Sequence, residues 1–364
     1  MSSHWGNHIR LSVFGESHGP VVGAVVEGLP PGFHPDWDEV HRQMTRRSAA
    51  GQVWATARAE ADEPQVLSGV RDGVLTGAPV MMEIRNGDAR SHNYPPSMEV
   101  PRPGHADYTA HVRYHGAEDH RGGGHFSGRL TAPIVWAGAL ARQVLAQRGV
   151  TIGSHIRRIG PVEDLTWGNT AHLTAEELDK LGRMAFPTLG EEAGHRMIGE
   201  IRTAKQDGDS LGGIVETAVV GLPAGLGSPM FDGLENRLAS LLFGIPAIKG
   251  LQFGDGFGLA ALRGSQANDP YESVDGQVRT TTNHNGGILG GITTGMPVVF
   301  SVAVKPTASI YHPQQSVSLT TGEAQTLVIE GRHDPCIVPR ALPVVEAATA
   351  VCLLDLWLEH RGME

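Results

Sequence analysis

One stretch of this 364-residue chain, residues 101–131, gathers side chains that bind anions and transfer protons. Three successive glycines, Gly122 to Gly124, lie within it, and glycine backbone can approach a ligand closely and present amide N–H groups to an anion. Imidazole, guanidinium and bare backbone amides together indicate a site for phosphate chemistry. The stretch holds five of the 18 histidines and four arginines, which are His105, His111, His115, His120, His125, Arg102, Arg113, Arg121 and Arg129.

The ordinary alternative is a solvated polar loop whose histidines have no function. His111, His115 and His120 have no distinctive setting in the sequence, and for these three we prefer that interpretation. The functional hypothesis therefore depends on the glycines and on the other cationic side chains.

A second candidate is the turn at residues 15–19, Gly-Glu-Ser-His-Gly, which joins apolar β-branched runs at residues 11–14 and 21–26. These runs predict two strands with His18 at the tip of their connection. Taken alone, His18 is interpreted as a turn residue. The order Glu, Ser, His is not a hydrolytic triad, because triads are defined by spatial roles and not by adjacency.

Two arginines end a predicted helix. Asp36 followed by Glu39 indicates an N-terminal cap, and the helix is expected to run to about Arg47. Cations at a helix C-terminus compensate the macrodipole, which is the structural explanation for Arg46 and Arg47. The functional alternative is a basic clamp for phosphate.

Two later stretches also carry polar groups beside turns. Residues 305–307 follow an apolar strand and are explained as its exit, and Asp334 precedes a proline, which is typical of a turn. Residues 283–291 form a second glycine-rich loop. After Pro343 an amphipathic helix is predicted to run to about His360.

The composition limits the class of protein. The formal net charge of −10 disfavours a nucleic-acid-binding protein, because such proteins present a basic surface. Two cysteines, Cys336 and Cys352, give neither a disulfide framework nor a metal-ligand spacing. Since neither a signal peptide nor an apolar run of membrane-spanning length is apparent, we expect a reduced, soluble, cytoplasmic protein that binds neither nucleic acid nor membrane.

The predicted elements favour a single domain over residues 1–364, of mixed α+β class with largely antiparallel sheets. Further strands are predicted at residues 77–86, 213–220 and 297–304. Strands and helices do not alternate as a dinucleotide-binding sheet requires, and neither nucleotide-binding glycine motif occurs in a convincing context.

An internal echo and two helices complete the prediction. Leu-Gly-Gly-Ile occurs at 211–214 and at 289–292, which reflects either internal pseudo-symmetry or chance. An alanine-rich helix ends near Gly149, and its N-terminal amides face the glycine loop if it begins soon after that loop. Thr174 and Glu177 predict a capping box for another helix.

Taken together, these motifs resemble the chorismate synthase family over nearly the whole chain. Any one matching stretch is weak evidence, but their joint occurrence in this order is highly specific, and it reverses the structural interpretation of His18, His105 and Asp334. The matching stretches are Gly15 to Gly19, Arg46-Arg47, Arg102 to Tyr108, Arg121 to Gly124, Gly208 to Gly213, Asn283 to Gly291, Lys305 to Thr307 and Arg332 to Pro335.

The resemblance implies a carbon–oxygen lyase that converts 5-enolpyruvylshikimate 3-phosphate to chorismate, the last step of the shikimate pathway to aromatic amino acids. The reaction is a 1,4-anti elimination of phosphate and a ring proton. The resemblance also implies reduced FMN as cofactor despite the absence of net redox change, NADPH as a candidate flavin reductant, a β-α-β sandwich domain and a homotetramer. Reduced flavin is electron-rich and can supply transient electron density, while the protein supplies binding, orientation and charge.

The resemblance also implies roles for particular residues. His105 would protonate the departing phosphate, and His18 would keep the reduced flavin in its proper protonation state. Histidine suits both tasks because its unperturbed pKa of ~6.5 lies near working pH. Asp334 would act as a base partner while the flavin accepts the substrate hydrogen. The arginines expected to hold the substrate's anionic groups or the flavin phosphate by bidentate pairing are Arg46, Arg47, Arg129 and Arg332.

Cofactor contacts are implied in the same way. Many family members have Arg-Ser-Ser-Ala-Arg after the triple glycine where this chain has residues 125–129, His-Phe-Ser-Gly-Arg, and further basic residues where it has residues 48–52. Both departures bear on flavin affinity and on an NADPH contact near Arg46. The implied FMN contacts are His125, Phe126, Ser127, Pro246, Ala247, Gly290, Lys305, Pro306, Thr307, Ala308, Ser309 and Arg332.

Two other classes of protein are open to the same residues. A metal-dependent hydrolase would use His18, His105 and His125, but the sequence has no H-E-x-x-H or comparable ligand spacing, so no metal site is expected. A non-catalytic flavin-binding protein would bind reduced FMN and release no phosphate from the substrate.

Overall fold

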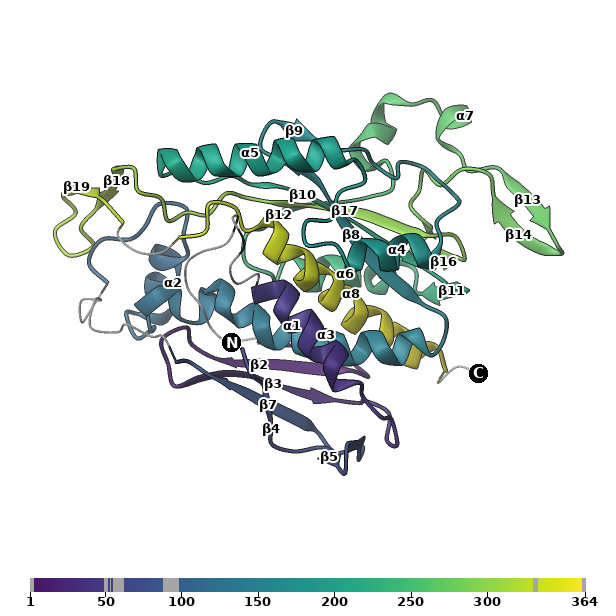
Figure 1. The fold of residues 1–364 in the computed structure, drawn as a ribbon, viewed down its shortest axis with the longest axis horizontal. Helices are drawn as coiled ribbons and strands as arrows, with labels where there is room; N and C mark the ends of the chain where they lie inside the picture. Colours follow the sequence, from purple (N-terminus) through teal and green to yellow (C-terminus); the bar gives the residue numbers. More distant parts are fainter. Residues whose placement is uncertain are drawn as a thin grey trace.

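In the computed structural model, which describes residues 3–48, 52, 54, 62–87, 98–329 and 333–361, two five-stranded sheets enclose a layer of helices (Figure 1). The purple and blue sheet comes from the start of the chain, and the teal and green sheet comes from its middle. The paired strands of every sheet run antiparallel. The predicted α+β sandwich with antiparallel sheets is confirmed. A single domain stays a prediction.

The strands confirm the predicted apolar runs. The first sheet has the order β1 (His4–Trp5), β2 (Arg10–Gly15), β3 (Val21–Glu27), β7 (Val80–Arg85), β4 (Gln65–Val66). The second has the order β12 (Ile248–Phe253), β17 (Val298–Val304), β10 (Gly213–Val220), β8 (Thr151–Ile159), β9 (Val162–Glu163). A third sheet and three hairpins comprise β11 (Ala224–Gly227), β16 (Ile292–Thr294) and β15 (Ile288–Leu289), then β5 (Val70–Arg71) with β6 (Val74–Leu75), β13 (Tyr271–Val274) with β14 (Gln277–Thr280), and β18 (Gln314–Val317) with β19 (Ala324–Leu327).

The helices lie between and around the sheets (Figure 1). They are α1 (Trp37–Ser48), α2 (Asp107–Tyr114), α3 (Thr131–Ala146), α4 (Ala175–Gly182), α5 (Glu191–Asp207), α6 (Leu234–Leu242), α7 (Gly264–Ala267) and α8 (Val338–Arg361), with 3₁₀ turns η2 (Arg121–Phe126), η3 (Gly128–Leu130), η4 (Met230–Asp232) and η5 (Gly256–Ala261).

Two predicted caps start these helices. The Asp36 carboxylate accepts the backbone N–H groups of Asp38 and Glu39 at 3.0 and 3.1 Å and so caps α1. Thr174 and Glu177 form the complete capping box of α4, as predicted. Both caps satisfy amide groups that a helix leaves without an internal partner.

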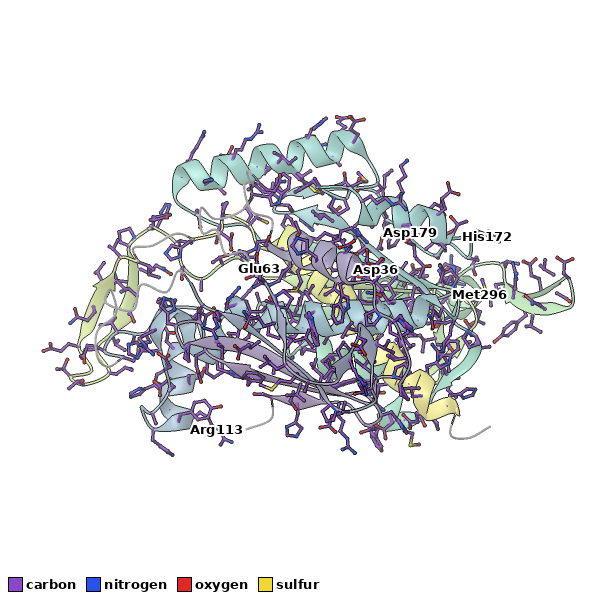
Figure 2. All side chains as sticks on the ribbon, turned by 60° about the horizontal axis from the view of Figure 1, so that its bottom comes forward. Asp36, Glu63, Arg113, His172, Asp179 and Met296 are labelled. Atoms are coloured by element: carbon purple, nitrogen blue, oxygen red, sulfur yellow. The ribbon has the colours of Figure 1, made fainter. Side chains whose placement is uncertain are left out.

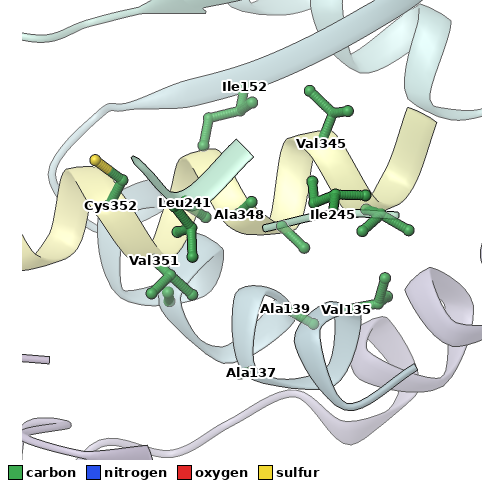
Figure 3. Close-up of a cluster of buried hydrophobic side chains, with 14 of the residues drawn as sticks. Val135, Ala137, Ala139, Ile152, Leu241, Ile245, Val345, Ala348, Val351 and Cys352 are labelled. Atoms are coloured by element: carbon green, nitrogen blue, oxygen red, sulfur yellow. The ribbon is translucent and has the colours of Figure 1, made fainter. Parts of the chain in front are cut away.

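Helix α8 is the centre of the core. It packs so closely on α3 that a Cβ atom on Gly138 would lie 2.3 Å from Cα of Ala347. Figure 3 shows apolar side chains of α3, α6, β8 and α8 facing one another. The predicted helix is present and ends at Arg361, close to the predicted end near His360. Its predicted start after Pro343 and its amphipathic character are wrong, because it already begins at Val338 and is buried on most of its circumference by α1, α3, α6 and β8.

The apolar character of α8 follows from that position. The segment Val338–His360 is long and apolar enough to cross a membrane, with a mean hydropathy of 1.7, contrary to the expectation that no such run exists. However, 89% of its most apolar window is buried inside the protein. A helix that is apolar on all sides is what the middle of a core requires.

The last turns of α8 fix the N-terminal segment. The buried Asp355 carboxylate accepts the backbone N–H groups of Asn7, His8 and Ile9 at 3.1, 2.6 and 2.7 Å. Arg237 of α6 forms an ion pair with the same carboxylate. One side chain near the C-terminus thus satisfies three amide groups near the N-terminus.

The repeated Leu-Gly-Gly-Ile takes two different local structures. At 211–214 it enters β10, whereas at 289–292 it makes the turn between β15 and β16. The echo is therefore not a repeated structural unit, although two five-stranded antiparallel sheets do face each other across the helices.

A buried charged cluster comprises His155 of β8, Glu216 of β10 and Asp164, which follows β9. His155 is fully buried, with Nε2 2.8 Å from the Glu216 carboxylate and Nδ1 3.6 Å from that of Asp164. Burial alone lowers the pKa of His155, but the two carboxylates outweigh it and raise that pKa above its ordinary value. Burial alone raises the pKa values of Asp164 and Glu216, but the hydrogen bonds they accept, above all from His155, lower both. The cluster is therefore held in its charged form.

Candidate active site

The predicted turn between β2 and β3 lies against the triple glycine. The backbone N–H of Ser17 donates to the carbonyl of Gly124 at 3.0 Å. Asn86, at the end of β7, donates through Nδ2 to the carbonyls of Glu16 and Gly19 at 3.0 and 2.8 Å. The first sheet therefore holds this turn in place over the glycine loop.

His18 and His105 face consecutive glycines. Gly122, Gly123 and Gly124 have φ angles of 58°, 86° and 52°, a backbone region that other L-residues rarely adopt. A Cβ atom on Gly122 would lie 2.1 Å from Cε1 of His18, and one on Gly123 would lie 3.0 Å from Cε1 and Nε2 of His105. The structure therefore brings these two predicted catalytic residues to one place, and it leaves no room for a side chain between them.

The start of α3 is not part of this loop. The helix begins at Thr131, the glycines themselves belong to the short turn η2, and the turn η3 lies between η2 and the helix. The helix does not begin directly after the glycine loop, so its N-terminal amides are not expected to face that loop. The amide groups available there belong to the positive-φ glycine backbone itself.

Asp107, the first residue of α2, holds His105 from behind. Its Oδ1 lies 2.5 Å from Nδ1 of His105. Arg102 donates to the same carboxylate through its backbone N–H, Nε and Nη2 at 3.0, 2.7 and 2.8 Å. Burial alone raises the pKa of Asp107, but these hydrogen bonds outweigh it and hold that pKa well below its usual range. Asp107 is therefore a permanent anion and hydrogen-bond acceptor.

The segment after β17 forms another wall of the site. Nζ of Lys305 donates to the carbonyl of Gly104, and a Cβ atom on Gly104 would lie 3.6 Å from Cβ of Ala308. The backbone N–H of Lys305 donates to the carbonyl of Ala247 at 2.9 Å. The predicted cofactor segment Lys305 to Ser309 therefore adjoins the loop that carries His105, and the predicted segment Pro246 to Ala247 adjoins Lys305.

Asp334 approaches the same region from the start of α8. Its carboxylate forms an ion pair with Arg340 at 2.6 Å, and Arg340 also donates through Nε to the carbonyl of Arg47 at 3.1 Å. Burial lowers the pKa of His333, and the nearby positive charge of Arg102 lowers it further. Arg102 thus acts electrostatically on both the histidine loop and the segment that precedes α8.

Arg47 and Arg129 bind one buried carboxylate. Nη1 of Arg47 lies 2.7 Å from Oδ2 of Asp62, and Arg129 pairs with the other oxygen. Arg47 also donates to Oγ1 of Thr131 at 3.0 Å, and Arg129 donates to Oδ1 of Asn86 at 3.1 Å. Because Asn86 holds the turn between β2 and β3, this arginine pair is connected to the site.

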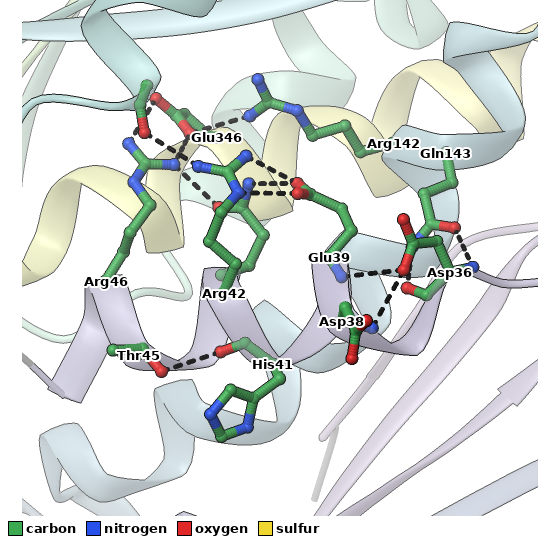
Figure 4. A network of polar contacts seen from close by, with 12 residues as sticks. Asp36, Asp38, Glu39, His41, Arg42, Thr45, Arg46, Arg142, Gln143 and Glu346 are labelled. Carbon is green, nitrogen blue, oxygen red and sulfur yellow. Dashed lines mark hydrogen bonds and ion pairs between the residues drawn. The ribbon is translucent and has the colours of Figure 1, made fainter.

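Arg46 points away from these groups. Its Nη1 lies 2.6 Å from the Glu346 carboxylate of α8, which also binds Arg142 at 2.9 Å (Figure 4). Successive residues of a helix point about 100° apart, so Arg46 and Arg47 cannot face the same ligand directly. A cavity of about 480 Å³ lies beside Arg46, and its other lining residues include His41, Arg42, Met184, Pro187 and Pro343.

His125 uses both ring nitrogens within the protein. Nδ1 lies 2.8 Å from the carbonyl oxygen of Gly15, and Nε2 lies 2.8 Å from Oγ of Ser3. The ring that replaces the usual arginine therefore ties the N-terminal segment to the glycine loop. Of its neighbours, Phe126 is partly exposed and Ser127 caps η3.

One predicted contact is not brought to the histidines, and another cannot be placed. Gly290 is exposed in the turn between β15 and β16, and Figure 1 places β16 at the opposite end of the molecule from α2. Arg332 lies outside the described residues.

His111 and His115, two of the three histidines interpreted as structural, do have structural settings. Nδ1 of His111 lies 3.1 Å from the Glu118 carboxylate, and His115 ends α2 with a φ of 54°. Arg113 is exposed and points outward from α2 (Figure 2).

Three polar residues of the site were not predicted from the sequence. Asp107 lies two positions after His105 in a motif that was recognised, and this spacing is the signal that would have found it. Asp62 and Asn86 carry no such signal, since their partners Arg47 and Arg129 are distant in sequence and meet them only through the fold.

The residues around the glycines fit an anionic, hydrogen-bonding ligand such as a flavin phosphate. Within the described part of the chain, Oγ of Ser17, Oγ1 of Thr307 and Nε2 of His333 are buried and have no hydrogen-bond partner. A buried polar atom without a partner costs about 1–3 kcal/mol, which a bound ligand can recover. Lys305 and the glycine amides supply the positive charge and the donors that a phosphate needs.

Comparison with known structures gives the class of protein. A solved structure titled "Crystal Structure of Chorismate Synthase" matches with a TM-score of 0.78 and 29% sequence identity, over 98% of this chain and 94% of that one. The family model described as "Chorismate synthase" matches residues 9–358.

Comparison of sequences agrees with this result. Proteins named "Chorismate synthase" are 48% identical in Thermococcus kodakarensis, over 99% of this chain and 98% of the relative, and 43% identical in Methanosarcina acetivorans, over 96% and 94%. The chain belongs to the chorismate synthase family. It is accordingly a lyase of the shikimate pathway, and membership assigns it the last step of that pathway.

Proposed function

We propose that this lyase converts 5-enolpyruvylshikimate 3-phosphate to chorismate and phosphate by 1,4-anti elimination, with reduced FMN as cofactor. The observation that carries the proposal is the placement of His18 and His105 against Gly122 and Gly123, beside the ammonium group of Lys305. Two imidazoles, a lysine and bare amides form one site suited to a leaving phosphate and its protonation.

His105 is the proposed acid. Its Nε2, on the side of Gly123, delivers a proton to the phosphate oxygen as the carbon–oxygen bond breaks. Arg47, Arg129 and Arg332 are the proposed anchors of the substrate's anionic groups, because guanidinium groups pair with carboxylates and phosphates bidentately. These anchors orient the substrate before the bond breaks.

His18 and Asp334 are the proposed proton-handling groups on the cofactor side. When bound, reduced FMN supplies electron density to an elimination that has no net redox change. His18 holds a proton toward the cofactor, and Asp334, fixed by Arg340, acts as the base. Asp334→Asn is expected to lower turnover by roughly two orders of magnitude. A rate close to the parent's would make Asp334 a structural residue.

The proposed FMN contacts are the segments that the sequence indicates, of which residues 305–309 adjoin the loop that carries His105 and residues 246–247 adjoin Lys305. Residues 125–127 belong to η2 and its end, and Gly290 lies apart in the single chain. Arg46 is the proposed contact of NADPH, since it lines the cavity of about 480 Å³ and not the histidine site.

We also propose a cytoplasmic homotetramer. Large apolar side chains are exposed from η4 to β14, as expected of a surface that other copies cover. The mass measured by light scattering should equal four chains. The most exposed of these side chains are Met230, Phe231, Phe257, Tyr271 and Val278.

One assay tests the proposed reaction. Phosphate release from 5-enolpyruvylshikimate 3-phosphate is measured anaerobically with chemically reduced FMN, and again under oxygen with and without NADPH. Release in the anaerobic arm is expected. If reduced FMN binds and no phosphate appears, the chain is a flavin-binding protein without this activity. Release under oxygen only with NADPH shows that the enzyme reduces its own flavin.

A further inference from the structure

His105 and Arg102 differ in function although both bind the carboxylate of Asp107. Asp107 is almost fully buried, with a side chain 2% exposed, and it accepts four hydrogen bonds. Three of these come from Arg102 and one comes from His105. This carboxylate also lies in the first turn of α2, where the positive end of the helix dipole stabilises an anion.

The contact at Nδ1 decides the tautomer of His105. Oδ1 of Asp107 lies 2.5 Å from Nδ1, whereas Nη2 of Arg102 lies 3.0 Å from it. An ionised carboxylate can only accept, so Nδ1 must carry the hydrogen. Arg102 already donates to Asp107 through Nε and Nη2. In the neutral ring Nε2 therefore has the lone pair, and in the protonated ring it has the transferable proton.

The direction of the ring follows from the same contact. Nε2 and Cε1 of His105 are the atoms that face Gly123, so the ring edge opposite the carboxylate is turned to the glycine backbone. A ring free to rotate would lose this direction. Asp107 thus fixes both the position of the transferable proton and the side to which it is offered.

We infer that Asp107 is the positioning residue of His105, and this inference rests on the proposed function of His105 as the acid for the leaving phosphate. Asp107 does not touch the substrate and acts through the imidazole. Arg102 keeps the carboxylate anionic and compensates its charge, so that His105 can lose and regain its proton. The other titratable or charged groups around His105 are Lys305 on the segment after β17, His18 beyond the glycines, and His333 and Asp334 before α8.

The first test compares Asp107→Asn with Asp107→Glu in the anaerobic phosphate-release assay over a range of pH. Asparagine removes the anion, so kcat is expected to fall at least about tenfold and to approach the loss in His105→Ala. KM should change less than kcat. The fall of kcat at high pH should move to lower pH, because the His105 imidazolium would still lie beside the cation of Arg102 but would no longer be stabilised by the anion of Asp107. Glutamate is expected to restore part of kcat.

The matched control is Glu118→Gln. Glu118 binds Nδ1 of His111 at 3.1 Å, so this variant removes a carboxylate from a histidine of α2, the helix that begins with Asp107, and leaves the contacts of His105 unchanged. Its pH profile should match the parent's. If Asp107→Asn also keeps the parent's kcat and pH profile, the inference is overturned.

The second test does not depend on activity. In protein labelled with ¹⁵N-histidine, the His105 resonances are assigned by their loss in His105→Ala, and the neutral ring is expected to carry its proton on Nδ1. A neutral ring protonated on Nε2 overturns the inference even where the Asp107 variants fail to fold. Absence of phosphate release in the parent enzyme would count against the proposed function alone, because the tautomer still tests Asp107.

Discussion

His105 and His155 both contact buried carboxylates, but the two histidines differ in what else binds those carboxylates. His155 lies between Asp164 and Glu216 and is 0% exposed. His105 shares Asp107 with Arg102, and its side chain remains 21% exposed. One histidine is enclosed by negative charge, and the other faces a glycine loop.

The difference shows how a histidine–carboxylate pair becomes either structural or chemical. Loss of the His155 proton would leave Asp164 and Glu216 buried together, with the Arg157 guanidinium no nearer to Glu216 than 3.9 Å, which is costly in a protein interior. His105 can lose its proton, because Arg102 still neutralises Asp107. The contacts of the carboxylate, and not the pair itself, decide whether the proton is held or transferred.

The largest effect expected is that of His105→Ala on turnover. Loss of the proposed acid should lower kcat roughly a hundredfold or more, with little change in FMN affinity or in melting temperature. The measurement is anaerobic phosphate release together with a flavin titration. Turnover near the parent's would show that His105 is a structural residue, as His155 is.

His155→Ala should show the reverse pattern. Removing one partner of a buried charged cluster should lower the free energy of unfolding by about 3–5 kcal/mol, while kcat per folded enzyme stays near the parent's. Urea denaturation and the same assay, performed below the melting temperature, give both values. A loss of turnover without a loss of stability would contradict the structural assignment.

Gly123→Ala tests the open side of His105. A residue with Cβ at φ +86° is strained by about 1–2 kcal/mol, and its Cβ atom would also displace the His105 ring, which is 3.0 Å away. Displacing a catalytic group typically lowers turnover about tenfold to a hundredfold. The control is Gly73→Ala, at φ +80° with nothing within 4 Å, which should show the strain and keep the turnover. Equal turnover in both variants would disprove the close contact.

The smallest effect expected is the pH dependence of stability at the His155 cluster. Since the pKa of His155 is raised, its stabilisation is complete below its ordinary value of 6.5 and is lost as pH rises through the raised value. The pKa values of Asp164 and Glu216 are lowered, so their stabilisation is present above ordinary values of 3.8 and 4.5 and is lost as pH falls through the lowered ones. Melting temperatures should therefore depend less on pH in His155→Ala than in the parent. Identical profiles would contradict this.

Much of the frame was predictable because it depends on local sequence. Apolar β-branched runs on both sides of residues 15–19 predict β2, β3 and their turn, and Asp36 predicts the start of α1. The joint order of the motifs predicted the family, which the comparisons confirm.

The side-chain partners were less predictable because they depend on segments that meet only in the folded chain. Arg46 and Arg47 are adjacent in sequence, yet one binds Glu346 and the other binds Asp62. Helical geometry already separates their directions, and sequence reasoning that treats them as one clamp misses this. Helix α8 was predicted to be amphipathic, but several elements surround it in the fold, and the sequence of the helix alone does not show this.

The position of α8 has a consequence for how the protein is made. Asp355 of α8 binds the amide of Asn7, which lies 348 positions earlier in the chain, and α8 also packs on α3, β8 and β10. Helix α3 and strands β8 and β10 are therefore synthesised before the helix that covers them, and these native contacts form only after α8 has left the ribosome. A nascent chain stalled before residue 338 would leave the surfaces that α8 covers exposed to chaperones and proteases.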